Sequence, residues 1–204
     1  MNFSFSIHNF TKTVDKGGVF MPYNRLLALE YARKWALSRN RAYYNFDKLG
    51  GDCTNFASQC IFAGSGVMNY TKTFGWYYIS LDQRAPSWTG VEFFYNFITQ
   101  NKGVGPFGRE ARIDELEIGD VIQLGRNADG FYHTLIVVGF DGDDPLIAAQ
   151  TNDAYMRPLS TYSYDFARYI KILGVRYITD DDYSCYDKII NAPSVPNPPV
   201  GEGQ

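Results

Sequence analysis

Gly50-Gly51-Asp52-Cys53-Thr54-Asn55-Phe56-Ala57-Ser58-Gln59-Cys60 is the most informative stretch of this chain, because it delivers a cysteine to the start of a predicted helix. Residues 54–63 contain neither Gly nor Pro, and Gly64 predicts the C-terminal end of this helix. Unpaired N–H groups and the positive end of the backbone dipole at a helix start lower the pKa of a thiol. The glycines before it permit a sharp turn and the close approach of a substrate backbone. The pattern therefore predicts that Cys53 is a nucleophile.

A cysteine nucleophile needs a base, and the chain has only two histidines, His8 and His133. His8 lies in a polar leader with no regular period. His133 opens the apolar run 133–140, which is typical of a buried strand with the histidine at its exposed mouth. Taken separately, Cys53 would be a buried structural cysteine and His133 a strand-end residue bonded to a backbone carbonyl. Taken together, the two residues favour a catalytic Cys–His pair.

A third group is needed to hold the tautomer and orientation of the imidazole. If the chain folds back through residues 141–145, the residues that face His133 lie near Gln150 to Asp153. Gln150 and Asn152 would share one strand face, and Asp153 would lie on the other. Gln150 is the first choice because it still lies on the apolar strand. Asn152 and Asp153 remain open as alternatives, since the sequence does not fix the register.

The oxyanion hole is expected to use the backbone N–H of Cys53 and one further donor, for which Tyr43 and Tyr44 lie close in the sequence. Asp52 is interpreted as a helix cap whose carboxylate accepts an N–H of the first turn and points away from the sulfur. Asn55 falls on the polar side of the helix. It either lines the cleft or faces solvent.

Composition excludes several classes of protein. The chain has 204 residues, 45% hydrophobic and 20% charged, which is typical of one globular domain. The net charge is −3 without a long Lys/Arg block, so a nucleic-acid partner is not expected. No stretch reaches the ~18 apolar residues of a membrane span.

Three cysteines without zinc-ligand spacing predict neither a metal nor a disulfide framework, and no cofactor is required. The N-terminus does not resemble a signal peptide, which favours a cytoplasmic location or release by lysis, phage or dedicated secretion.

The order of the predicted elements indicates an α+β fold, with helices first and an antiparallel sheet second. The predicted helices are 24–38, the cysteine helix and 90–100, and the predicted strands are 117–124, 133–140, 146–151 and 169–178. Residues 1–22 are interpreted as a leader of uncertain order, 23–190 as a single domain, and 191–204 as a disordered Pro-rich tail.

Over about residues 23–178 the chain resembles the putative amidase domain family, within the papain-like and NlpC/P60-like cysteine hydrolases. The matching elements are Tyr31-Ala32, Trp35-Ala36, the block 50–60, Trp76-Tyr77, Ser87-Trp88-Thr89, Gly119-Asp120-Val121-Ile122-Gln123, His133 with Ile136-Val137, and Thr151-Asn152-Asp153 with Pro158-Leu159-Ser160. The resemblance implies a papain-like fold, with N-terminal helices packed on the sheet, Cys53 as nucleophile and His133 as base. The expected oxyanion and groove residues are Tyr43, Tyr44, Asp52, Asn55, Trp76 and Trp88. One departure is Gln150-Thr151, where the family is expected to carry His-Thr.

The resemblance also implies a bacterial protein that hydrolyses amide or peptide bonds, with cell-wall (peptidoglycan) peptides as the commonest substrate among relatives. The leading hypothesis is a cysteine amidase or endopeptidase that works through an acyl-enzyme. The alternatives are an acyltransferase of transglutaminase-like chemistry and a catalytically weak papain-like binding module.

Overall fold

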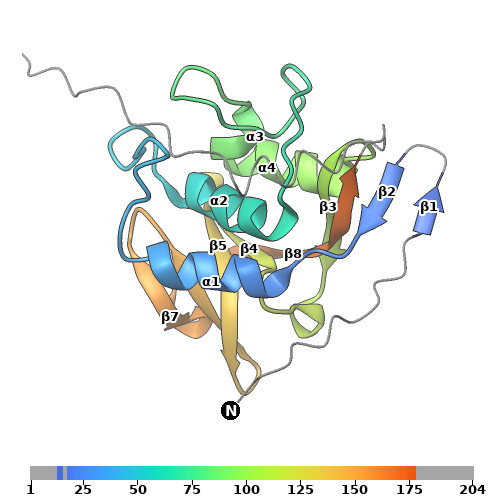
Figure 1. The fold of residues 1–204 in the computed structure, drawn as a ribbon. Helices are drawn as coiled ribbons and strands as arrows, with labels where there is room; N and C mark the ends of the chain where they lie inside the picture. The colour runs from blue at the N-terminus through green and yellow to red at the C-terminus, as the bar shows by residue number, and fades with distance from the viewer. Residues whose placement is uncertain (1–12, 16–17, 178–204) are drawn as a thin grey trace, which may run out of the picture.

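The computed structural model, which describes residues 13–15 and 18–177, is an α+β protein with an antiparallel sheet, as the sequence predicted (Figure 1). Its helices are α1 (Arg25–Trp35), α2 (Cys53–Ser65), α3 (Pro86–Thr89) and α4 (Val91–Gln100). Its strands are β1 (Thr13–Asp15), β2 (Gly18–Met21), β3 (Gly105–Ala111), β4 (Val121–Arg126), β5 (Gly130–Asp141), β6 (Asp144–Ala149), β7 (Ala154–Pro158) and β8 (Phe166–Tyr177). Two short 3-10 helices are η1 (Ile113–Glu115) and η2 (Leu159–Thr161).

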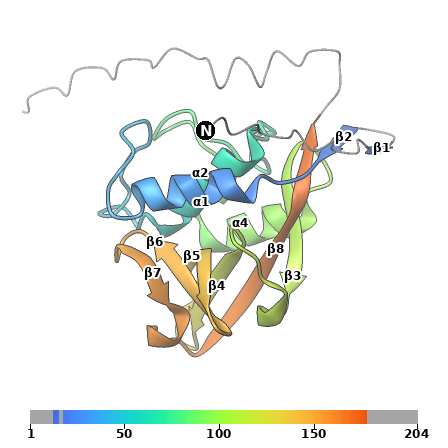
Figure 2. The ribbon, with the colours of Figure 1, turned by 60° about the horizontal axis from the view of Figure 1, so that its bottom comes forward.

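The strands form one sheet in the order β1-β2-β8-β4-β5-β6-β7, and β3 pairs with β8. Each pairing is antiparallel. Figure 2 shows α1, α2 and α4 gathered on one side of this sheet. Within the described part of the chain, none of the helices has the length and apolar character needed to cross a membrane.

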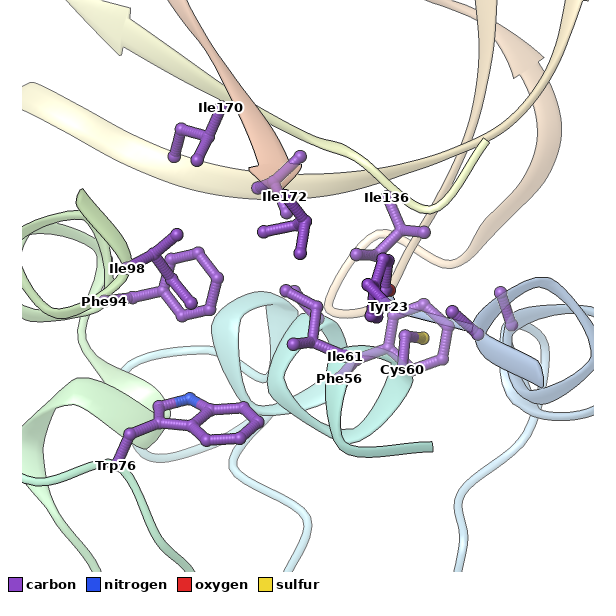
Figure 3. Packing of buried hydrophobic residues seen from close by; sticks show 14 of the residues in the cluster. Tyr23, Phe56, Cys60, Ile61, Trp76, Phe94, Ile98, Ile136, Ile170 and Ile172 are labelled. Carbon is purple, nitrogen blue, oxygen red and sulfur yellow. The ribbon is translucent and has the colours of Figure 1, made fainter. Parts of the chain in front are cut away.

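Both faces of the sheet are buried, and residue parity decides which face each side chain takes. The helix side holds Val121, Ile136, Val138, Ala148, Ile170 and Ile172, which pack with Phe56, Cys60 and Ile61 of α2 (Figure 3). The opposite face holds a second cluster, which includes Ile122, Leu124, Leu135, Val137, Ile147 and Leu159. A buried residue of β4 or β5 therefore packs in one cluster or the other, and a shift of one residue moves its side chain to the opposite face.

The three predicted helices are present as α1, α2 and α4, but α1 ends at Trp35 where the prediction extended to 38, α3 was not predicted, and the end of α2 needs a correction. The side chain of Asn24 caps α1 by accepting the N–H of Leu27. The predicted stop at Gly64 is wrong, because α2 continues to Ser65 and ends at Gly66, whose φ is 68°. Gly64 instead allows close packing against Tyr23, since a Cβ there would lie 2.3 Å from the ring.

The four predicted strands correspond to β4, β5, β6 and β8, whereas β3 and β7 were not predicted. The β3 sequence 105–111 contains glycine and proline and lacks clear alternation, so only its pairing with β8 reveals it as a strand. Part of the predicted leader also joins the sheet, since β2 pairs with the end of β8. Residues 1–12, 16–17, the predicted tail 191–204 and the predicted domain end at 190 lie outside the described residues.

Candidate functional site

Cys53 is the first residue of α2, at the helix start where the sequence predicted it. The turn before it uses glycine where glycine is required, with φ of 89° at Gly50 and 99° at Gly51. The hydroxyl of Thr151 accepts the Asp52 N–H at 2.5 Å, and a Cβ on Gly51 would lie 3.2 Å from that same oxygen. The turn that presents the cysteine is therefore held by the β6–β7 connection, distant in the sequence.

Asp52 does not cap α2, and this corrects the expectation. Its side chain makes no cap hydrogen bond. One carboxylate oxygen accepts the Phe46 N–H and the Asn55 amide, both at 2.9 Å, and the other lies 3.4 Å from Arg39 Nε. Burial raises the pKa of the Asp52 carboxyl, although these hydrogen bonds and Arg39 oppose the shift. Asp52 therefore fixes the loop before the helix, and the first N–H groups of α2 are left without that cap.

The thiol of Cys53 is buried, with 7% of the residue exposed. Burial raises its pKa, while hydrogen bonds from the backbone of Thr134 and from Thr54 lower it. The sequence predicted a lowered pKa from the helix start, and desolvation outweighs that effect in this conformation. Cys60, two helical turns further on, is a fully buried core residue. Cys185 lies outside the described residues.

His133 and Cys53 lie on opposite faces of the sheet, so the predicted pair is not formed in this conformation. Thr134 faces the helix side, where its hydroxyl lies 2.9 Å from that of Thr54. His133, one residue earlier, is paired with Leu124 and projects into the opposite cluster. The centroid of its ring lies 6.0 Å from that of Tyr132 and 6.2 Å from that of Tyr162, which both pack against this cluster. The side-chain period of two places adjacent residues on opposite faces, and the sequence did not reveal which parity His133 takes.

The environment of His133 is apolar and leaves one ring nitrogen unsatisfied. The residue is 6% exposed, and its Nε2 is buried without a hydrogen-bond partner among the described residues. Burial, with a smaller contribution from the positive charge of Arg157, lowers the pKa of His133 from 6.5 to about 4. The imidazole is therefore neutral at pH 7.

This shift in pKa predicts a loss of stability in acid. Because the folded-state pKa lies below the unfolded value, His133 contributes stability above pH 6.5, and this contribution is lost as the pH falls toward about 4. The loss amounts to about 3 kcal/mol. The free energy of unfolding in urea is measured for wild type and for His133→Leu from pH 7 to pH 4. The difference between the two proteins at each pH isolates the contribution of His133, because the other titrating groups are common to both. Parallel stability curves for the two proteins would contradict the assignment.

The three candidates for the third catalytic position do not contact His133. Gln150 is buried and its Nε2 donates to the carbonyls of Trp35 and Ser38, both at 2.7 Å, so it closes the end of α1. Asp153 forms an ion pair with Arg39 at 2.7 Å. Asn152 is exposed in the turn after β6. None of the three is placed to orient His133, because the β6–β7 turn meets the end of α1 instead of the start of β5.

The predicted groove tryptophans belong to the core, which corrects their assignment. Trp76 and Trp88 are fully buried. Trp88 Nε1 donates to Asn55 Oδ1 at 2.9 Å, and Trp76 Nε1 donates to Ser58 Oγ at 3.1 Å. Asn55 is itself buried, so the alternative that it faces solvent is wrong. These hydrogen bonds hold the polar side of α2 against the two tryptophans, and they therefore fix the orientation of the helix that begins at Cys53.

Tyr43 and Tyr44 lie beside a shallow polar recess that also contacts Asp52 and Asn55. The ring of Tyr43 stacks on Trp88, with centroids 5.9 Å apart. The backbone carbonyl of Tyr44 accepts the Asn55 amide at 3.1 Å. A donor role for either tyrosine at an oxyanion stays a prediction.

A buried polar chain next to Cys53 was not predicted from the sequence. Thr134 receives a hydrogen bond from Gln123 Nε2 at 3.2 Å, and Gln123 Oε1 accepts from Arg168 Nε at 2.6 Å. Arg168 in turn forms an ion pair with Glu92 at 3.0 Å. Gln123 is fully buried between apolar neighbours in β4. A glutamine among buried apolar residues of a strand was the sequence signal that could have revealed this series of hydrogen bonds.

Comparison with known proteins gives a family and two relatives. The family described as "Putative amidase domain" matches residues 22–173. "Uncharacterized protein YhbB" of Bacillus subtilis (strain 168) is 39% identical over 139 residues, which cover 66% of this chain and 43% of that protein. "Uncharacterized protein YjcM" of the same strain is 33% identical over 149 residues, which cover 67% and 32%. The chain thus spans less than half the length of the curated relatives that it matches. No solved structure matches it.

Proposed function

Since the chain belongs to the putative amidase domain family, we propose that it is a cysteine-dependent amidase, with Cys53 as the nucleophile. The family description points to a hydrolase of C–N bonds. The finer assignment rests on one observation: α2 begins at Cys53, and the side chain of Asp52 does not occupy the N–H groups of its first turn. When the sulfur attacks an amide carbonyl, negative charge develops on the carbonyl oxygen. These N–H groups can then stabilise that oxyanion.

The proposed reaction passes through a thioester. The Cys53 thiol gives its proton to the imidazole of His133, and the sulfur attacks the amide carbonyl. The C–N bond breaks as His133 returns the proton to the leaving amine. Water then hydrolyses the thioester and restores the thiol. A papain-like arrangement of nucleophile and base is part of this proposal, and it requires His133 to reach the Cys53 face.

Peptide amides of bacterial cell walls are the proposed substrate class. The test is incubation of the protein with purified peptidoglycan fragments, followed by mass spectrometry of the products. Amidase activity yields new carboxylic acids and amines, whereas added amine nucleophiles would be incorporated if the enzyme transfers acyl groups. An unchanged fragment mixture would contradict the substrate assignment and favour a binding module.

A further inference from the structure

We propose that His133 reaches Cys53 through a one-position shift of the β-bulge at the start of β5, and that Gln123 then orients its imidazole. This inference rests on the proposed function, because it supplies the base that the nucleophile requires. The described conformation is then a resting state in which nucleophile and base are held on opposite faces of the sheet.

The bulge lies directly at His133. On β4, Leu124 pairs with His133 and Gly125 pairs with Phe131, so Tyr132 is an extra residue on β5. Tyr132 and His133 thus oppose the single residue Leu124, and both rings lie against the same apolar cluster, stacked at 10°. A β-bulge of this kind locally disrupts the ladder and changes the direction of a side chain.

A shift of the bulge by one position along β4 moves only one side chain between faces. His133 and Thr134 would then oppose Gln123, and Tyr132 alone would oppose Leu124. Tyr132 would remain on its present face and Thr134 on the face of Cys53. Only His133 would cross the sheet.

The rest of the sheet can stay as it is during this shift. The pairing of β5 with β6 begins at Ile136, so the segment that moves is paired to β4 alone. Phe131 and Leu135 would keep their partners on either side of the bulge. The change therefore requires only the rearrangement of the β4–β5 hydrogen bonds around residues 132–134.

Two observations favour the shifted position for His133. In the resting conformation its Nε2 is a buried polar atom with no partner in the described part of the chain, and such atoms are rare in folded proteins. In the shifted conformation the imidazole would lie across from Gln123. The Oε1 of Gln123 accepts one bond, from Arg168, and a carbonyl oxygen has capacity for a second. An imidazole N–H could donate to it, which would leave the other ring nitrogen for the Cys53 proton.

Two single-residue deletions fix the two registers. Deleting Thr134 removes the bulge and pairs His133 with Gln123, on the Cys53 face. Deleting Tyr132 also removes the bulge but pairs His133 with Leu124, on the far face. The Thr134 deletion also removes hydrogen bonds to Cys53 and Gln123, so it is compared with the Tyr132 deletion and not with wild type, and it is expected to hydrolyse peptidoglycan fragments faster than that variant. The Tyr132 deletion is expected to lose at least about 100-fold, the contribution of a general base. Circular dichroism and thermal melting check that both variants fold.

Disulfide trapping tests the shift without relying on activity. In His133→Cys, mild oxidation followed by peptide mapping is expected to reveal a disulfide between positions 53 and 133. Leu135→Cys is the matched control, since residue 135 stays on the far face in both registers. The bond should form readily with Thr134 also deleted and should be absent with Tyr132 deleted. No bond in full-length His133→Cys, or equal bonds in both deletions, overturns the proposal.

Gln123 is tested as a positioning residue by comparing two substitutions. Gln123→Leu is expected to lower kcat with little change in KM, because the substrate does not contact it. Gln123→Glu keeps an acceptor for the imidazole N–H and is expected to restore most of kcat. Equal loss in both variants would indicate a purely structural role. If the disulfide pattern holds but Cys53→Ala retains full hydrolysis, the shift stands and the proposed function is what fails.

Discussion

Cys53→Ala is expected to abolish amide hydrolysis while the protein keeps its fold. If Cys53 is the nucleophile, no thioester can form without its sulfur, and kcat/KM should fall by at least about 10⁴-fold. The substitution removes one buried atom at the start of α2 and leaves the bonds of Asp52 and Asn55 in place. The release of amines from peptidoglycan fragments, followed by mass spectrometry, measures the loss.

Cys60→Ala is the matched control for this experiment. Cys60 lies on the same helix and is fully buried in the helix-side core. Its substitution should cost about 1 kcal/mol of stability, as an ordinary core truncation does, and should leave kcat unchanged. Retention of hydrolysis by Cys53→Ala, or equal losses in the two variants, would refute the nucleophile assignment.

Asp120→Ala is expected to give the largest loss of stability, about 3–5 kcal/mol. Asp120 is fully buried, and its carboxylate accepts Arg25 Nη1 at 2.7 Å and the N–H groups of Ile172 at 2.9 Å and Glu117 at 2.8 Å. Burial raises the pKa of this carboxyl, and Arg25 opposes the shift. Removal of the carboxylate leaves Arg25 with Glu117, at 2.9 Å, as its remaining acidic partner among the described residues, and it leaves the N–H groups of Ile172 and Glu117 unpaired. The free energy of unfolding in urea measures the loss.

Asp114→Ala is the control for this second experiment. Its ion pair with Arg112 has the same chemistry and a distance of 2.6 Å, but both side chains are largely exposed. Solvent screens such a pair, so the urea midpoint is expected to stay at the wild-type value. Similar midpoints for Asp120→Ala and Asp114→Ala would show that the buried contact between α1 and β8 does not hold the fold together.

Local patterns in the sequence predicted the elements that carry the site. The block 50–60 predicted a helix that starts at a cysteine, and the structure begins α2 at Cys53. The apolar run from His133 predicted β5. Both signals are local, because glycine punctuation and side-chain period depend only on neighbouring residues. The roles of Asp52, Trp76, Trp88 and Gln150 were missed, because each is set by a partner distant in the sequence.

Local sequence patterns were therefore enough to predict that a cysteine starts a helix and that a histidine lies near the start of a strand. The placement of these two residues on opposite faces of the sheet emerged from the folded structure. The physical reason is that a strand alternates its side chains with a period of two, and the face of His133 depends on where the β4–β5 pairing accommodates the extra residue. That position is set by the packing of both cores around β5, which no local pattern encodes.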